Sequence, residues 1–380
     1  VFQPRMLLSG ALLAFIVGFT HSDPIDRVSH YVMASDLPAQ GNKTFEFTQP
    51  MFVYVSTFVD NSKYDNKIRF NDNQSGLRKN AWAAAQSFSE GREKKPVFAE
   101  GSSSITIINF NEHVFDDAQS PAVFYFVDAS IRSAVYEAPG GQDMNRLDGA
   151  ANGTLTIMSA SMSTAVLDFR MPMGVPVRLI AGGAAEVNSE QQEIISFDDD
   201  SVSWAILPIP IVSITSVEDF QLRVASKESD RLTFLQENAV VGVRTVVMSP
   251  GWGFDNIPSK DLQYSIKLQH TATVSVEYVG SIRYHSSSLQ VIGSSTIGEQ
   301  TYAQKFDKES WATRAMNATF SAQIVSVDIR HPVGAPGGVL VRIFTSHSED
   351  SSQPTTPSPS AFDFSNMLCR IFSLCNKSSD

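Results

Sequence analysis

Short runs of β-branched and aromatic residues, separated by Gly, Pro, Asn and Ser, dominate the pattern of this chain. Such runs are typical of strands in sandwiches or barrels, whereas βαβ units would alternate them with helical segments. The predicted strands cover residues 45–59 (divided at Gln49-Pro50), 105–110, 122–127, 155–158, 166–170, 175–180, 204–215, 232–235, 240–248, 262–269, 271–279, 288–293, 320–330 and 339–344.

Helical periodicity is scarce. Residues 80–90 form one candidate helix, in which Asn80 caps the first turn while Trp82 and Phe88 supply an apolar side. Residues 308–316, around Trp311, form a weaker candidate. The predicted fold class is therefore all-β with little helix.

An internal repeat is the most informative feature. Residues 167–174 align without a gap onto 327–334, with Asp, Arg, Pro and Gly identical, and 177–180 matches 341–344. Residues two apart in a strand share a face, so Asp168 and Arg170 lie side by side opposite a core face, as do Asp328 and Arg330. Proline and glycine then form a turn. Each copy is interpreted as a β-hairpin that closes a domain.

The repeat predicts two tandem antiparallel β-sandwich domains, at residues 23–185 and 204–346, joined by the segment 186–203. The architecture resembles that of CUB-like or jelly-roll-like domains. The cysteines typical of such extracellular modules are absent, so no residue role is carried over. Residues 347–360, rich in Ser, Thr and Pro, are a predicted extended linker to an apolar cysteine-containing tail, residues 361–380.

The N-terminal segment has the pattern of an export signal. Residues 7–19 are apolar or small, and Thr20 and Ser22 fit cleavage before Asp23. The stretch is shorter than the roughly 20 residues that a membrane span requires. We interpret residues 1–22 as a signal peptide, with an N-terminal core helix as the alternative, and the protein as secreted.

Composition narrows the classes of partner. The chain has 29 Lys and Arg against 40 Asp and Glu, a formal net charge of −11. This balance argues against a nucleic-acid binder, which needs a basic face. Later apolar runs are interrupted by charges or prolines, so no transmembrane segment is expected.

Export gives meaning to Asn-x-Ser/Thr tripeptides and to the cysteines. Predicted glycosylation sites are Asn42, Asn73, Asn152 and Asn317, while Asn376 lies too near the end to be a strong candidate. The two cysteines, Cys369 and Cys375, exclude a disulfide-dense scaffold. In an oxidising compartment they pair with each other across a turn, pair between chains, or stay free.

Motifs for catalysis or for cofactor binding are missing from the sequence. It has no Gly-x-Ser-x-Gly elbow, Walker loop or Rossmann fingerprint, and outside the leader no two histidines have metal-ligand spacing, so no cofactor is predicted. Acidic segments at 198–200 and 60–72 could bind Ca²⁺, although solvated loops are the simpler interpretation. Trp252 and Phe254, in a glycine-rich turn, are candidate ligand contacts or caps on the end of a sandwich.

These observations favour a secreted, non-enzymatic glycoprotein that binds an extracellular protein or glycan. One alternative is a β-sandwich hydrolase or lyase on polysaccharide, which needs two facing carboxylates about 5 to 10 Å apart. Another is a structural assembly protein crosslinked through its C-terminal cysteines.

Overall fold

The computed structural model describes residues 28–57, 67–87, 93–112, 122–138, 145–159, 164–170, 175–184, 193–197, 202–226, 232–239, 241–242, 244–249, 252, 261–282, 285–295, 298–330 and 338–347. The expected signal peptide, the linker after His347 and the cysteine-containing tail lie outside these residues. The predicted all-β class is confirmed, because three sheets made mainly of antiparallel strand pairs account for most of the described chain.

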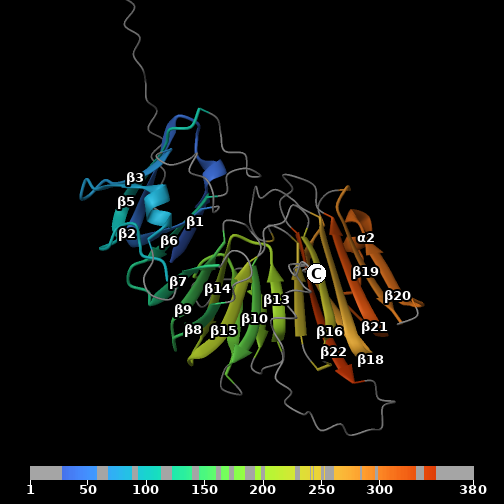
Figure 1. Ribbon diagram of the computed structural model, residues 1–380. Coiled ribbons are helices and arrows are strands. Elements are labelled where there is room, and N and C mark those ends of the chain that lie inside the picture. The colour runs from blue at the N-terminus through green and yellow to red at the C-terminus, as the bar shows by residue number, and fades with distance from the viewer. Residues whose placement is uncertain are drawn as a thin grey trace, which may run out of the picture.

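The N-terminal part forms a six-stranded antiparallel sheet, coloured blue to cyan in Figure 1. Its spatial order is β1 (Ser29–Met33), β6 (Ala122–Asp128), β2 (Gly41–Thr57), β5 (Ser102–Asn109), β3 (Ile68–Asp72) and β4 (Arg78–Asn80). Where two strands were expected around Gln49-Pro50, β2 is continuous. Its first half pairs with β5 and its second half mainly with β6, with a register shift between Glu46 and Met51. Pro50 lacks an N–H group, so the shift lies where the ladder loses a donor.

Within the described residues, two helices and one 3₁₀ turn accompany the strands. The turn is η1 (Ala34–Asp36). Helix α1 (Ala81–Ala85) begins at the predicted cap, because Asn80 Oδ1 accepts the N–H of Ala83 at 3.3 Å. Helix α2 (Lys308–Ala312) buries Trp311. Both helices occur where predicted and are shorter than expected. No helix within the described residues has the length and apolar character needed to cross a bilayer.

Two further sheets follow. The five-stranded sheet has the order β12 (Glu193–Phe197), β11 (Val177–Ala181), β14 (Ile211–Ser216), β9 (Thr154–Met158) and β7 (Ser133–Glu137). The eleven-stranded sheet has the order β20 (Gln300–Phe306), β19 (Ser288–Ser294), β21 (Asn317–Arg330), β18 (Leu262–Ser281), β22 (Gly338–His347), β17 (Arg244–Met248), β13 (Val202–Leu207), β10 (Thr164–Arg170), β15 (Phe220–Ser226) and β8 (Asn145–Gly149), with β16 (Leu232–Ala239) paired to β18.

Strand β18 takes part in both layers of the C-terminal sandwich. Its first half pairs in parallel with β16, its second half pairs with β22, and β21 follows it on either side of a register shift between Lys267 and Ala272. Alternate residues of both halves, from Leu262 to Tyr278, face one apolar core. Residues two apart share a face, so the two halves of the strand line the same core from two sides.

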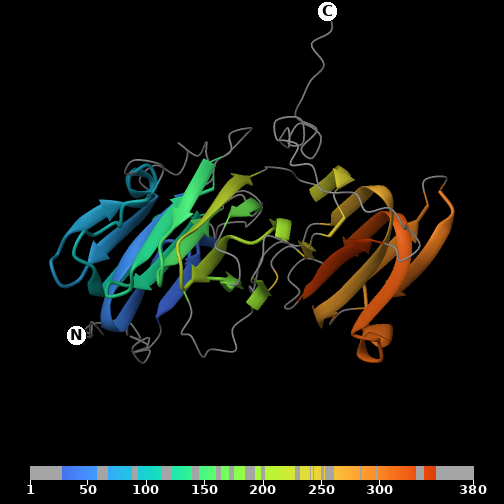
Figure 2. The same cartoon turned by 90° about the horizontal axis from the view of Figure 1, so that it is seen from below.

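The three sheets share cores rather than forming separate bodies. All seven residues of β6 are buried. Phe124 and Phe126 belong to the N-terminal core, whereas Tyr125 packs with residues of the other two sheets. In β17, Val246 and Val247 likewise face different cores. Figure 2 shows the green middle strands between the blue N-terminal and orange C-terminal ends.

The predicted hairpins are wrong for both copies of the repeat. Strand β10, which carries Asp168, pairs with β13 and β15, while β11 lies in another sheet. Strand β21, which carries Asp328, pairs with β18 and β19, and β22 pairs with β17 and β18. A turn motif determines where a strand ends. It does not determine which strand the following segment pairs with, because that depends on where the segment buries its apolar face.

The segment expected to join two domains, residues 186–203, contains β12, whose Ile194 is fully buried, and the start of β13. Strands before and after this segment pair with each other. Strand β14 pairs with β9 and β11, and β15 pairs with β8 and β10. Hydrogen-bonded strand pairs therefore cross the expected junction in both the five-stranded and the eleven-stranded sheet.

Candidate functional site

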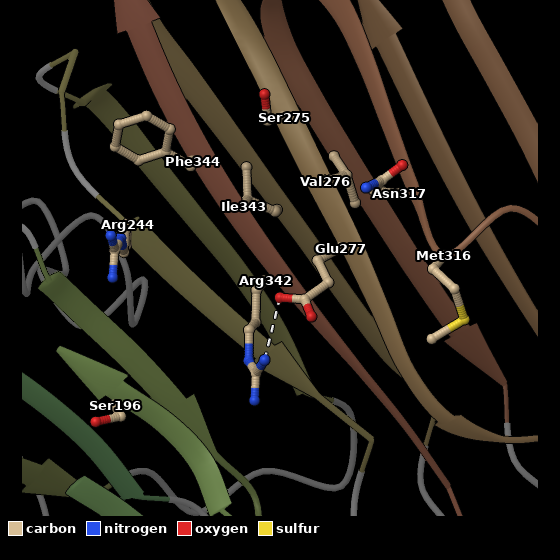
Figure 3. A pocket seen from close by; sticks show the side chains of 10 residues that line it. All are labelled: Ser196, Arg244, Ser275, Val276, Glu277, Met316, Asn317, Arg342, Ile343 and Phe344. Carbon is tan, nitrogen blue, oxygen red and sulfur yellow. Dashed lines mark hydrogen bonds and ion pairs between the residues drawn. The ribbon is translucent and has the colours of Figure 1, made fainter.

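A pocket of about 520 Å³ lies where the edge strand β12 meets the exposed face of the eleven-stranded sheet (Figure 3). Five segments contribute to it: β12, β17, β18, β22 and the start of β21. Its lining residues are Ser196, Arg244, Ser275, Val276, Glu277, Met316, Asn317, Arg342, Ile343 and Phe344.

Strand register brings the polar lining residues to one face. Glu277 lies opposite Arg342 and Asn317, and Phe344 lies opposite Arg244 and Ser275. Directly opposite residues in antiparallel strands point to the same side of the sheet. The apolar core of the C-terminal sandwich occupies the other side, so this face holds charged and polar groups on a rigid support.

Arg342 links two sheets at the base of the pocket. Its Nη1 lies 3.1 Å from Glu277 Oε2, and its Nε donates to the carbonyl oxygen of Ile194 on β12 at 2.8 Å. The side chain of Glu277 is 50% exposed, so the ion pair itself adds little stability. Its main effect is to fix the direction of the guanidinium group, which is planar and donates in a fixed fork.

The second guanidinium group lies over the ring of the partly exposed Phe344. Arg244 Cζ lies 5.8 Å from the centre of the Phe344 ring, and that ring is 38% exposed. Met316, at the opposite rim, is 57% exposed. Two guanidinium groups and one carboxylate give the described lining one positive charge in excess, although the whole chain is acidic.

The carboxylates of the two grooves bear on the hydrolase alternative. The described lining contains a single carboxylate, Glu277, and that group is paired. A second groove, of about 400 Å³, lies on β16, β18, β19 and β21 and also contains one carboxylate among its described lining residues, Asp328. Neither site therefore shows the two facing carboxylates that glycoside hydrolysis requires.

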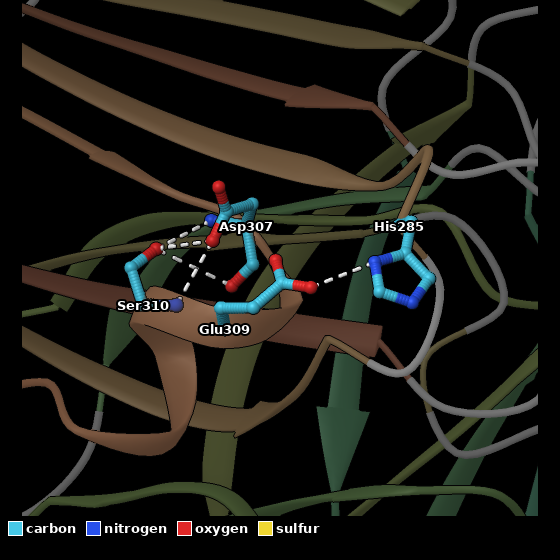
Figure 4. A network of polar contacts seen from close by, with 4 residues as sticks. All are labelled: His285, Asp307, Glu309 and Ser310. Carbon is cyan, nitrogen blue, oxygen red and sulfur yellow. Dashed lines mark hydrogen bonds and ion pairs between the residues drawn. The ribbon is translucent and has the colours of Figure 1, made fainter.

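A Ser, His and acid cluster at helix α2 is a helix cap rather than a catalytic group (Figure 4). Asp307 Oδ1 accepts from the N–H and the hydroxyl of Ser310 at 2.9 and 2.6 Å. These hydrogen bonds from Ser310 lower the pKa of Asp307. His285 contacts Glu309 at 2.8 Å, and both side chains are exposed. The Ser310 hydroxyl thus bonds to Asp307 instead of to the imidazole that would have to activate it.

The four asparagines predicted to carry glycans are all exposed. Asn73 is held on the sheet surface, because its Nδ2 donates to Ser104 Oγ at 2.8 Å and to Thr106 Oγ1 at 3.0 Å. Asn152 occupies a turn at a φ of 53°. Asn317 lines the pocket described above. Exposure is compatible with glycosylation at Asn42 and at these three positions, which stays a prediction.

The remaining predicted site residues are not gathered at the pocket. Trp252 is 8% exposed and packs against Gly280 and Gly338, a position that fits its alternative role as a cap on the sandwich end. Phe254, Cys369 and Cys375 lie outside the described residues.

Sequence reasoning missed a buried ion pair between Lys94, which lies in the segment between α1 and β5, and Glu137 of β7. The side chain of Lys94 is 1% exposed, and its Nζ lies 2.5 Å from Glu137 Oε2 and 3.1 Å from the carbonyl oxygen of Ala85. Ser56 donates to the other Glu137 oxygen. Lys94 belongs to a charged segment, Glu93-Lys94-Lys95, that resembles a solvated loop, so no local signal identifies it.

Two other polar groups owe their properties to tertiary contacts. Burial of Asp72 opposes its ionisation, but hydrogen bonds from Ser102, Ser75 and the backbone of Gln74 outweigh that effect and lower its pKa. Burial, with smaller contributions from Glu93 and Tyr125, raises the pKa of Tyr54 to about 12. Neither group faces the pocket.

Tyr125 lies between the six-stranded and five-stranded sheets, fully buried. Its hydroxyl oxygen accepts the N–H of Ala184 at 2.9 Å, and Ser29 donates to the carbonyl of the same residue at 2.5 Å. Burial raises the pKa of the Tyr125 phenol. These bonds satisfy polar atoms that would otherwise be costly at an apolar interface.

No family model matches the sequence, and no curated protein matches it. Among solved structures, the CUB1-EGF-CUB2 domains of rat MASP-1 are 8% identical, with a TM-score of 0.21, covering 55% of this chain and 99% of that one. The CUB1-EGF-CUB2 domain of human MASP-1/3 is 9% identical, with a TM-score of 0.23, covering 53% and 99%. A triple jelly roll protein of an archaeal virus is 10% identical, with a TM-score of 0.13, covering 81% and 84%. Likenesses this weak carry no argument about function.

Proposed function

We propose that the protein is an exported, non-enzymatic binding module and that the pocket around Arg342 is its ligand site. The observation that carries this proposal is the juxtaposition of Arg244 with the exposed Phe344 ring on a rigid sheet face. Aromatic residues, including Phe, and arginine are enriched at protein interfaces relative to the rest of the surface. The ligand is an extracellular protein or glycan with a group that pairs with guanidinium.

Export is part of the proposal and rests on the apolar N-terminal segment. A binding module also fits the chemistry of the pocket better than a hydrolase does. Its described lining supplies one carboxylate, already paired with Arg342, and no second acid to act with it.

The test is to screen the purified full-length chain against a glycan array and a panel of secreted proteins, and to measure each positive by biolayer interferometry. We expect at least one ligand, with an affinity that falls about tenfold or more in Arg244→Ala and Phe344→Ala. Arg146→Ala is the matched control, because Arg146 is exposed on β8, away from the pocket. Silence on both panels, or equal binding by all variants, would refute the proposal.

A further inference from the structure

We propose that the pocket around Arg342 selects a saccharide that carries a carboxylate. This inference rests on the proposed function and names the ligand class of the same site. It follows from three features of the pocket: an excess positive charge, an exposed ring beside that charge, and small polar side chains at the rim.

The charge comes from Arg244. Arg342 has Glu277 as its ion partner, whereas no carboxylate lies within ion-pair distance of Arg244 among the residues that the structure describes. A guanidinium group presents two parallel N–H donors that match the two oxygens of a carboxylate. The whole chain has a net charge of −11, so a local excess of positive charge attracts anions to this pocket and not to the acidic remainder of the surface.

The exposed Phe344 ring supplies the second feature. Binding sites for small ligands combine an apolar surface with a few polar groups that fix orientation. The ring offers a flat apolar surface to the C–H face of a sugar, and Arg244 lies 5.8 Å from its centre. A sugar that contacts the exposed part of the Phe344 ring therefore places a carboxylate within reach of Arg244, which lies over the same ring.

The rim provides hydrogen-bonding groups for hydroxyls. Ser196 on β12 and Ser275 on β18 line the pocket together. Hydroxyl side chains both donate and accept, as recognition of sugar hydroxyls requires. The pocket volume of about 520 Å³ lies within the usual range for small-molecule sites, roughly 300 to 1,000 Å³, so a short oligosaccharide fits.

An acidic peptide is the competing ligand, and the structure disfavours it. Strand β12 is a sheet edge to which an extended peptide could add. Arg342 Nε already occupies the carbonyl oxygen of Ile194 on that edge, at 2.8 Å. A peptide strand would lose that acceptor. The apolar lining exposed at the pocket is limited to Phe344 and Met316, which offers little anchorage for peptide side chains.

The experiment is isothermal titration calorimetry of the full-length chain with four probes. They are a tetrasaccharide of alternating glucuronic acid and N-acetylglucosamine, its carboxyl-reduced form, a sialylated trisaccharide and a hexaglutamate peptide. We expect one or both acidic saccharides to bind at least about tenfold more tightly than the reduced form and the peptide. The two acidic probes separate uronate from sialate as the source of the carboxylate.

Variants locate the selectivity. Arg244→Ala should weaken acidic-saccharide binding about tenfold, Arg244→Lys should retain part of it, and Arg146→Ala should leave it unchanged. Equal binding of the carboxyl-reduced form overturns the inference and leaves the proposed function standing. The same conclusion follows if only the peptide binds, or if none of these four probes binds while another glycan or protein does. If no ligand of any class binds, both proposals fail.

Discussion

The buried ion pair of Lys94 and Glu137 offers the sharpest test of the fold, because its two ends differ in access to water. The Lys94 side chain is 1% exposed and that of Glu137 is 20% exposed. Replacing Glu137 by Leu removes the carboxylate partner of an ammonium that water cannot reach, although the carbonyl oxygen of Ala85 still accepts from it. Replacing Lys94 by Met leaves a carboxylate that is partly solvated and accepts from Ser56.

The expected magnitudes follow from this asymmetry. Removing one partner of a buried pair costs about 3 to 5 kcal/mol, whereas replacing both by apolar residues of similar volume is often neutral or stabilising. We therefore expect Glu137→Leu to lower the free energy of unfolding by about 4 to 5 kcal/mol and Lys94→Met by about 3 kcal/mol. The double variant should lie within about 1 kcal/mol of the parent protein.

The assay is urea denaturation followed by circular dichroism, with hydrogen exchange on β2 and β7 to show which sheets open first. Arg146→Met is the control, since it removes an exposed pair with Asp148 and should cost less than about 0.5 kcal/mol. The reasoning fails if Lys94→Met costs as much as Glu137→Leu. It also fails if both cost no more than the control, or if the double variant is as unstable as the worse single one.

Three further results are expected. In Gly183→Ala the new Cβ would overlap the buried Tyr125 ring, so the free energy of unfolding should fall by about 1 to 3 kcal/mol in thermal denaturation. A decrease of less than about 0.5 kcal/mol would mean that the ring can move aside. The lowered pKa of Asp72 means that its stabilising contribution is present above the ordinary value of 3.8 and is lost as pH falls through the folded pKa. The stability difference between the parent and Asp72→Asn should therefore shrink from about pH 7 to about pH 3, and a constant difference would contradict the assignment. The pKa of Tyr54 is raised from 10 to about 12, so its contribution to stability is fully present below pH 10 and is lost as pH rises through 12. The parent should therefore lose stability relative to Tyr54→Phe between these two pH values. Parallel plots of stability against pH for the two proteins would contradict the raised pKa.

Local sequence signals located many of the elements. The run at 122–127 became β6, whose residues are all buried, and Asn80 caps α1 as its side-chain chemistry suggests. These predictions succeed because apolar runs and caps act within a few residues of the chain.

Strands with polar alternation were missed for the same reason. Strand β20, with the sequence QTYAQKF, buries only its last residue completely, and β7, with the sequence SAVYE, buries only Val135. Edge strands of this kind are held by the backbone ladder with a single neighbour, which is β19 for β20 and β9 for β7, so their own residues carry little signal.

The repeat shows where local inference ends. Its alternation correctly placed Val327 and Ile329 toward a core, and Asp328 with Arg330 toward the other face, where they lie 3.3 Å apart. It did not determine the partners of the strand, because the same alternation satisfies any neighbour that covers the apolar face.

The sequence by itself determined the β-rich class of this protein and the positions of the two short helices among its described residues. Only the tertiary structure decided that Arg244, Phe344 and Arg342 meet at one pocket and that Lys94 is buried. The physical reason is that alternation assigns a residue to a face of its own strand, while strand pairing and sheet packing depend on contacts between residues far apart in the chain.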